Sequence, residues 1–268
     1  MAFDLPELRE TYSRDGVVLL PRALDTTALG EALDAWEWSL ANPGPGASRI
    51  PSRSQATFYQ DLYNPRCLEG YAAMLKASPL PAMIADIWGT PEVWFMYEQV
   101  FLKEGGEARR TPWHQDSSYL SIAGPDLAVA WITFEAVGAA DSLEFVRGSH
   151  RGVLYNGSSF KLGDDTAPLH PGDALPRLPD IEANRADFDI VSFPVEPGDV
   201  VLFHPAMLHG GGATHPGARR RTLTLRFFGR DAIYDARPGP AGPRVDGFHA
   251  TMKTGDPFRH SSFLKLAP

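Results

Sequence analysis

The segment from Gly198 to Phe228 reads GDVVLFHPAMLHGGGATHPGARRRTLTLRFF and combines two predicted strands with a glycine-rich turn. The first predicted strand, Asp199 to Phe203, is a short apolar run that ends before a histidine-proline pair. The second, Arg220 to Phe228, alternates between two sets of side chains with the period of two that β-strands show. Two strands on either side of a compact turn indicate a β-rich fold.

Other segments of the chain show strand patterns as well. Val93 to Lys103 alternates with period two, and short apolar runs lie at Asp15 to Pro21, Leu127 to Phe134 and Leu143 to Val146. Turn residues bound each of them, as expected of strands in a sheet. The 25 glycines and 24 prolines also favour many turns over long helices. We predict a mainly β fold of the α+β class.

Three helices are predicted, all in the N-terminal third of the chain. Asp25 can cap the first, which has one apolar face and ends at Asn42. The second begins at Asn64-Pro65 and ends near Ala77, and the third is short and ends at Trp88. These helices are expected to flank the sheet.

Two long segments show neither a helical nor a strand period. Residues 42–55 are rich in Gly, Pro, Ser and Arg, and residues 155–186 are irregular and rich in Pro and Asp. We expect both to be loops that border a pocket, because loops on a rigid scaffold often carry binding residues. The segment before residue 42 is too short for a complete domain. A single domain over residues 1–268 is therefore predicted.

Charge and cysteine content argue against several classes of function. The formal net charge is −8, whereas nucleic-acid binders and proteins of anionic membrane surfaces need clustered positive charge. Cys67 is the only cysteine, so an intrachain disulfide and a cysteine-based zinc site are excluded. The sequence has no long apolar run, and residues 1–20 lack the order of a signal peptide. We expect a cytoplasmic protein that acts on a small molecule.

A metal site is predicted from three residues that lie far apart in the sequence. His114 and Asp116 form a His-x-Asp motif, which in an extended segment points both side chains to one face. The motif alone is weak, since chance produces it in about half of chains with this histidine content. His209 follows a predicted strand and completes a set of two imidazoles and one carboxylate. This set suits Fe(II) and leaves adjacent metal positions open for a 2-oxo acid and O2.

Arg220 is predicted to bind the far end of that 2-oxo acid. 2-Oxoglutarate carries a second carboxylate, and a planar guanidinium binds a carboxylate through two hydrogen bonds. Arg220 lies on a predicted strand shortly after His209, and it shares one strand face with Thr222, Thr224 and Arg226. A barrel interior can therefore receive Arg220 and Thr222 together.

These residues and their spacing resemble the phytanoyl-CoA dioxygenase family. The matching segments are Asp15 to Pro21, Pro112 to Asp116, Ala128 to Phe134, Val146 to His150, and His209-Gly210 with Arg220 at the family's offset. The resemblance implies a double-stranded β-helix, a jelly-roll or cupin-like barrel. It implies Fe(II), 2-oxoglutarate and O2 as reactants, with succinate and CO2 as products. It also implies that Lys103 and Thr222 help to hold 2-oxoglutarate.

The same resemblance bears on the type of reaction. Hydroxylation of an unactivated C–H bond in a small-molecule metabolite is favoured over halogenation, because the related halogenases replace the carboxylate that Asp116 supplies. Two positions depart from the family pattern. Asp141-Ser142 stands where Asn-Gly is usual, and Arg147 precedes Gly-Ser-His where proline is usual. Neither change touches a predicted ligand.

Three alternatives compete with this interpretation. His204 lies five residues before His209 and is a rival ligand, although a core histidine is the simpler role for it. His209-Gly-Gly-Gly212 resembles the oxyanion-hole motif of some esterases, but the Gly-x-Ser-x-Gly motif of a serine hydrolase is absent. A non-catalytic β-barrel binding protein is the third, and it has no physical reason to keep four convergent polar groups in its core.

Other side chains near the motifs are expected to have structural roles. Trp113, Tyr119 and Trp131 are predicted to pack the barrel rather than to contact substrate. The remaining histidines without a partner pattern are expected at the surface, namely His170, His215, His249 and His260. The sequence gives no preference for the charge of the substrate and none for an oligomeric state.

Overall fold

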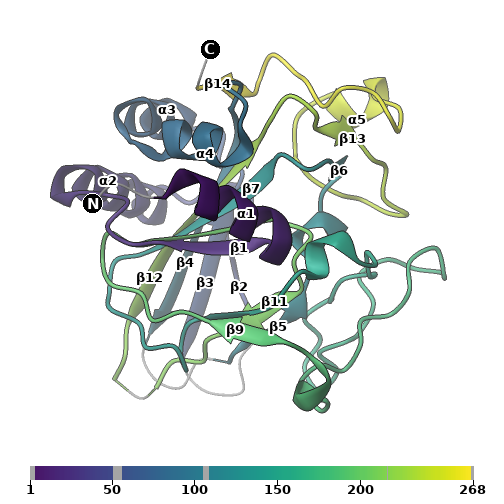
Figure 1. Cartoon of the computed structure of the whole chain (residues 1–268). Helices are drawn as coiled ribbons and strands as arrows, with labels where there is room; N and C mark the ends of the chain where they lie inside the picture. The colour runs from purple at the N-terminus through teal and green to yellow at the C-terminus, as the bar shows by residue number, and fades with distance from the viewer. Residues whose placement is uncertain (1–3, 51–55, 105–108, 216, 267–268) are drawn as a thin grey trace.

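The computed structural model describes residues 4–50, 56–104, 109–215 and 217–266 (Figure 1). Its larger sheet contains β1 (Val17–Leu20), β2 (Ser48–Arg49), β3 (Thr57–Leu62), β4 (Trp94–Glu104), β7 (Leu127–Thr133), β10 (Val200–Phe203), β12 (Arg220–Phe228) and β14 (Leu264–Lys265). The smaller sheet contains β5 (Thr111–His114), β8 (Leu143–Val146), β9 (Ile190–Ser192) and β11 (His209–Gly211), and β6 (Ile122–Ala123) pairs with β13 (Ile233–Tyr234).

All named strand pairs are antiparallel, and the order shows how distant segments meet. The larger sheet runs β1-β10-β7-β12-β4-β3-β2, with β14 also paired to β4, and the smaller runs β5-β11-β8-β9. Over the described residues the two sheets stay separate and do not close into one continuous barrel. The prediction of a mainly β fold is confirmed.

Four helices cover one side of the larger sheet and a fifth lies near the C-terminus (Figure 1). They are α1 (Leu5–Asp15), α2 (Thr26–Ala41), α3 (Leu68–Ala77), α4 (Leu80–Trp88) and α5 (Phe248–Thr251). The cap of α2 is the predicted one, since Asp25 Oδ1 accepts a hydrogen bond from the Ala28 amide at 2.9 Å. Helices α1 and α5 were not predicted.

The predicted start of α3 at Asn64-Pro65 is wrong, because the helix begins at Leu68. The Asn64 side chain is used in a turn instead. Its Oδ1 accepts from the Arg66 amide at 3.2 Å, and its Nδ2 donates to the Asn42 carbonyl at 2.8 Å. Asparagine forms turns of this kind as readily as it caps helices, so the sequence pattern fits both.

The strand predictions are largely confirmed, but the alternation within β4 is broken once. Strands β7, β8, β10 and β12 begin and end within one residue of their predicted limits. In β4 the register shifts opposite Arg226 and Phe227, so that Tyr97 pairs with Arg226 and Phe95 with Phe227. Met96 is the extra residue of this bulge, and Phe95 therefore packs among the helices rather than beside Tyr97.

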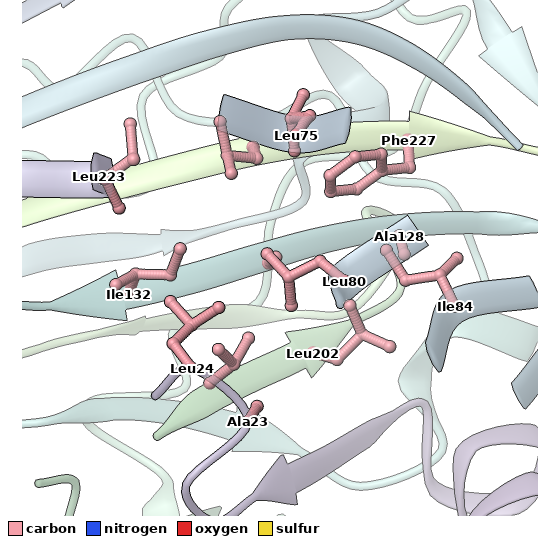
Figure 2. Close-up of a cluster of buried hydrophobic side chains, with 14 of the residues drawn as sticks. Ala23, Leu24, Leu75, Leu80, Ile84, Ala128, Ile132, Leu202, Leu223 and Phe227 are labelled. Atoms are coloured by element: carbon pink, nitrogen blue, oxygen red, sulfur yellow. The ribbon is translucent and has the colours of Figure 1, made fainter. Parts of the chain in front are cut away.

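The main apolar core lies between the larger sheet and the helices (Figure 2). Leu75, Leu80 and Ile84 project from α3 and α4 toward the sheet, where Ile132, Leu202, Leu223 and Phe227 meet them. A second cluster lies on the other face of the same sheet, where Trp131 and Phe203 contact Phe145 of the smaller sheet. The second face is therefore the one on which the two sheets meet.

The structure confirms one of the two predicted loops and shows a strand in the other. Residues 155–186 contain no helix or strand apart from a single 3-10 turn beginning at Arg185, as expected. Residues 42–55 include strand β2, which pairs with β3 to form a hairpin, while 51–55, with Arg53, lie outside the described residues. Within the described part of the chain, every helix is too short or too polar to span a membrane.

Candidate metal centre

Strands β5 and β11 place two histidines opposite each other. His114 is the last residue of β5, His209 is the first of β11, and the two are Cα partners in the sheet. The chain then turns into a short 3-10 helix whose first residue is Asp116. Asp116 Oδ1 lies 3.4 Å from His114 Nε2 and 3.9 Å from His209 Nε2. The three predicted ligands are thus brought together, and they form a buried group that could hold a metal ion.

Backbone carbonyls determine which nitrogen of each histidine faces the centre. His114 Nδ1 lies 2.8 Å from the Pro112 carbonyl, and His209 Nδ1 lies 3.0 Å from the Met207 carbonyl. A carbonyl oxygen only accepts, so each Nδ1 carries the proton and each Nε2 lone pair is free for a metal. Burial and the neighbouring His114 ring lower the pKa of His209 to about 3, which keeps it neutral at pH 7.

Arg226 contacts the carboxylate ligand, a role that was not predicted for it. Its Nη2 donates to Asp116 Oδ2 at 2.7 Å and to Gln99 Oε1 at 2.8 Å, and its guanidinium lies 4.6 Å from the centroid of the Tyr97 ring. Burial opposes the charge on Asp116, but Arg226 and the two imidazoles hold the pKa of this carboxyl well below its ordinary value. Asp116 therefore offers one oxygen to the histidine side, while Arg226 occupies the other.

This group lies in the wall of a cavity of about 940 Å³ that is lined by residues of both sheets. The polar face predicted for Arg220 to Phe228 points into this cavity, as expected. Four cross-strand pairs of β12 and β4 line it in register, namely Arg220 with Lys103, Thr222 with Phe101, Thr224 with Gln99, and Arg226 with Tyr97. One strand pair thus joins the metal-binding group to a cationic region of the same cavity.

Arg220 is buried in that cationic region, and its partners among the described residues are backbone carbonyls rather than carboxylates. Its Nη1 donates to the Asp141 carbonyl and its Nη2 to the Gly212 carbonyl at 2.7 Å. A guanidinium has five N–H groups, and the described residues provide partners for two of them, so three are left for a ligand as far as the described part of the chain shows. Burial lowers the pKa of Arg220 to about 10, which leaves it charged at pH 7. These features fit a bound carboxylate.

Lys103 lies beside Arg220, and its side-chain nitrogen is hydrogen-bonded to backbone carbonyls. Its Nζ donates to the Gly212 carbonyl at 2.8 Å and to the Arg109 carbonyl at 3.0 Å, and Thr111 Oγ1 lies 3.5 Å away. Burial and the nearby Arg220 lower the pKa of Lys103 well below its ordinary value. Lys103 thus shares the Gly212 carbonyl with Arg220, while Thr222 lines the cavity one pair further along β12.

The glycines after His209 have a steric role at this point. A Cβ atom on Gly212, whose φ is +65°, would lie 2.3 Å from Arg220 Nη1 and 2.4 Å from the Asp141 carbonyl oxygen. Only glycine therefore lets Arg220 reach both carbonyls. His209–Gly211 also forms a strand that is paired on both sides, by β5 and β8, which disfavours an esterase-type oxyanion hole here.

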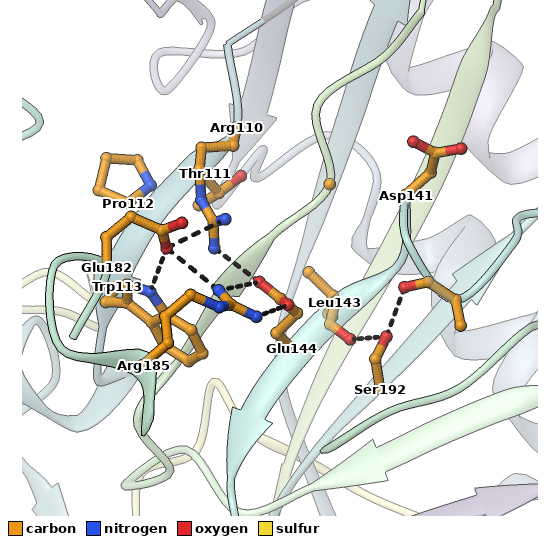
Figure 3. A network of polar contacts seen from close by, with 12 residues as sticks. Arg110, Thr111, Pro112, Trp113, Asp141, Leu143, Glu144, Glu182, Arg185 and Ser192 are labelled. Atoms are coloured by element: carbon orange, nitrogen blue, oxygen red, sulfur yellow. Dashed lines mark hydrogen bonds and ion pairs between the residues drawn. The ribbon is translucent and has the colours of Figure 1, made fainter. Parts of the chain in front are cut away.

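A polar network holds the outer side of β5 (Figure 3). Arg110 Nη2 donates to Glu144 Oε2 at 2.8 Å, and Trp113 Nε1 donates to Glu182 Oε2 at 3.1 Å. Arg185 bonds to both of these carboxylates. Burial opposes ionisation of Glu144, but Arg185 and Arg110 hold its pKa below the usual range. The network fixes the strand that ends in His114 to β8 and to the 155–186 loop.

Other predicted roles are partly confirmed. His204 is a buried core histidine, with Nε2 3.0 Å from the Gly124 carbonyl and Nδ1 accepting from the Ala206 amide, so it is not a metal ligand. His170 was expected at the surface but is buried, because its Nε2 meets the Ser118 carbonyl at 2.9 Å. Tyr119 and Trp131 line the cavity, contrary to the expectation of packing alone, whereas Trp113 packs outside it.

Comparison with known proteins identifies the family. The family model described as "Phytanoyl-CoA dioxygenase (PhyH)" matches residues 12–222, and the chain belongs to this family. Human peroxisomal phytanoyl-CoA dioxygenase is 26% identical over 189 residues, which are 69% of this chain and 52% of the human protein. The rat protein is 24% identical over 200 residues, 73% of this chain and 56% of the rat protein. The chain thus spans about half the length of the curated relatives it matches.

Solved structures confirm the double-stranded β-helix expected from the sequence. The α-ketoglutarate-dependent epimerase SnoN of nogalamycin biosynthesis superposes with a TM-score of 0.71 at 20% identity, covering 98% of both chains. The carbocyclase SnoK gives 0.69 at 20% identity, covering 97% of this chain and 96% of its own. EctD from S. alaskensis gives 0.66 at 17% identity, covering 91% and 84%. Family membership and the His-Asp-His group together confirm iron and 2-oxoglutarate as the expected cofactors.

Proposed function

We propose that the protein is an Fe(II)- and 2-oxoglutarate-dependent oxygenase that hydroxylates an unactivated C–H bond of a small molecule and releases succinate and CO2. The observation that carries the proposal is that a buried His-Asp-His group and an arginine without a carboxylate partner among the described residues line one cavity. This combination of residues can bind a metal ion and a dicarboxylate in the same cavity.

The residues have distinct roles in this proposal. His114, Asp116 and His209 would hold the iron through two neutral imidazoles and one carboxylate oxygen. Arg220 would bind the far carboxylate of 2-oxoglutarate with the N–H groups that have no partner among the described residues, next to Thr222, and Lys103 would support this position by sharing the Gly212 carbonyl. Bound iron supplies the activation of O2 that is coupled to decarboxylation of 2-oxoglutarate and to oxidation of a C–H bond.

The chain's own contribution is to hold and orient these groups. Arg226 fixes one oxygen of Asp116, so that the carboxylate would offer its other oxygen to the iron. The Nδ1 bonds of His114 and His209 to backbone carbonyls keep the Nε2 atoms unprotonated. A cavity of about 940 Å³ also has room for a substrate beside 2-oxoglutarate.

Hydroxylation is the reaction we propose, although the same fold also occurs in the epimerase SnoN and the carbocyclase SnoK. Asp116 supports it, because a carboxylate at this position leaves no vacancy for a halide ion. The product test is direct: a hydroxylated substrate gains the mass of one oxygen atom, whereas an epimer has unchanged mass and a new ring has lost two hydrogens.

The first experiment measures succinate release from labelled 2-oxoglutarate by anaerobically iron-loaded protein that is then exposed to O2. His114→Ala and Arg220→Ala should both abolish release, the first through the metal and the second through 2-oxoglutarate. Arg219→Gln is the matched control, since Arg219 precedes Arg220 and is half-exposed beside Glu104. A wild-type protein that binds neither Fe(II) nor 2-oxoglutarate would refute the proposal. One that binds both and shows no turnover with any substrate would support the non-catalytic binding protein instead.

A further inference from the structure

The wall of the cavity carries an excess of positive charge. Among the described residues that line it there is one acidic side chain, Asp116, against six basic ones: Arg49, Lys103, Lys161, Arg220, Arg226 and Arg244. The whole chain has a formal net charge of −8, so this local excess runs against the composition. A cavity with one sign of charge concentrates ligands of the opposite sign.

Three of the six cations lie deep and have partners. Arg226 is bonded to Asp116, Lys103 is bonded to backbone carbonyls, and Arg220 is assigned to 2-oxoglutarate. These three lie in the strand pair β4 and β12. They are accounted for by the metal centre and the co-substrate.

The other three cations are exposed residues that line the same cavity. Arg49 lies on β2, Lys161 in the 155–186 loop and Arg244 after β13, so three separate segments bring positive charge to the wall of one cavity. Arg49 Nη1 donates to Thr57 Oγ1 at 3.3 Å. Over the ranges that the structure describes, the Lys161 ammonium and the Arg244 guanidinium form no ion pair or hydrogen bond. Neither iron nor 2-oxoglutarate requires these charges.

Aromatic side chains also line this cavity. Phe160 lies edge-on to His114 at 5.4 Å between ring centroids, and Tyr63 stacks on Tyr97 at 3.7 Å. Tyr63 and Phe160 both have φ near +55°, a left-handed conformation that residues other than glycine rarely adopt. Such conformations persist where the surroundings hold them, and they concentrate at ligand sites. Both rings thus border the space where a substrate would lie.

The volume of the cavity limits the size of a substrate that can reach both the metal centre and the three outer cations. A sphere of its volume is about 12 Å across, and this space must also hold 2-oxoglutarate. In a coenzyme A thioester, the pantetheine arm that separates the phosphates from the acyl carbon is longer than this. A substrate that lies wholly within this cavity, with an anionic group at the three outer cations, must therefore have a compact body.

We propose that the substrate is a compact organic anion, with an apolar or aromatic body against Tyr63 and Phe160 and a carboxylate or phosphate group at Arg49, Lys161 and Arg244, and that it is not a coenzyme A thioester. This inference rests on the proposed function for the chemistry at the metal. Its binding step is independent of turnover, so the two can fail separately.

The test is a fluorescence titration of the anaerobic protein saturated with Fe(II) and 2-oxoglutarate. The probes are 8-anilino-1-naphthalenesulfonate and N-phenyl-1-naphthylamine, which share one ring system and differ in the sulfonate group. We expect the anionic probe to bind at least tenfold more tightly. The variant Arg49→Gln/Lys161→Gln/Arg244→Gln should reduce that preference by about tenfold, which is about twofold for each charge at an exposed site. Lys76→Gln/Lys253→Gln, which removes two exposed cations away from the cavity, should leave it unchanged.

Competition then identifies the anion. Displacement of the sulfonate probe by 1-naphthoate supports a carboxylate, and displacement by 1-naphthyl phosphate supports a phosphate. Equal affinity of the two probes, absence of binding of the sulfonate, or a preference that survives in the triple variant would overturn the proposal. Displacement by coenzyme A that is lost in the triple variant would overturn the exclusion of thioesters. If the anion preference holds while no succinate is released in the assay above, the proposed function fails and the binding proposal stands.

Discussion

Replacement of Arg220 tests the site most directly, because the structure shows which N–H groups of its guanidinium already have partners. Two N–H groups are bonded to the Asp141 and Gly212 carbonyls, and the other three have no partner among the described residues, which leaves them for a carboxylate. Truncating one partner of a buried, hydrogen-bonded charge pair costs about 2–5 kcal/mol. Arg220→Gln should therefore weaken 2-oxoglutarate binding by roughly 30-fold to a few thousand-fold, since about 1.4 kcal/mol corresponds to a factor of ten.

Arg220→Lys separates charge from geometry. Lysine keeps the positive charge but loses the planar fork, so we expect an intermediate loss of about tenfold. The assay is calorimetric titration of 2-oxoglutarate into anaerobic Fe(II)-loaded protein, with Arg219→Gln as the control. Thermal unfolding of each variant checks that the two carbonyls left without a donor have not unfolded the site. Binding of 2-oxoglutarate by Arg220→Gln within threefold of wild type would refute the assignment of this arginine.

Three further predictions concern the metal centre and the core. Arg226→Met should lower the unfolding free energy of the metal-free protein by about 3–5 kcal/mol in denaturant titrations, because Asp116 is left buried without its cation; a change under 1 kcal/mol would contradict this. The double variant Asp116→Ala/Arg226→Met should be more stable than Arg226→Met, since no unpaired carboxylate remains, although it should bind no Fe(II); strict additivity in the double-mutant cycle would argue against the pair. Burial lowers the pKa of His204 to about 4 against an unfolded value near 6.5. The unfolded chain therefore takes up this proton first, and stability should fall as pH drops from about 6.5 toward 4, by about 2 kcal/mol at pH 5. His204→Gln should remove that part of the pH dependence, and an unchanged slope would exclude His204 as its source.

The sequence predicts the features that depend on local pattern. Strand β12 alternates strictly, and its polar face does point into the cavity. The cap at Asp25 is correct because an aspartate before an apolar periodic segment has few alternatives. Asn64 shows the limit of this reasoning, since an asparagine can serve a turn or a cap, and the choice depends on Asn42, a residue far away along the chain.

The features that were missed depend on contacts between distant segments. The bulge at Met96 comes from the pairing of β4 with β12, and period two within β4 alone gives no sign of it. His170 looks like a surface histidine until the 155–186 loop folds over Ser118. Arg226 was placed on the correct face, but its partner Asp116 reaches it from beyond β5, in the other sheet.

Strand β12 also explains why the metal centre and the co-substrate region depend on each other. It is paired to β4 along its whole length and to β7 from Thr222 onward. Arg220 and Arg226 lie on the same face of this strand, one at the cationic region and the other at Asp116. A shift of one residue in its register would turn Arg221, Leu223 and Leu225 into the cavity and remove both arginines at once. The pairing that buries Leu223 and Leu225 in the core therefore also sets the geometry of the site, so we expect a core substitution that loosens β12, such as Leu225→Ala, to reduce 2-oxoglutarate affinity without contacting it.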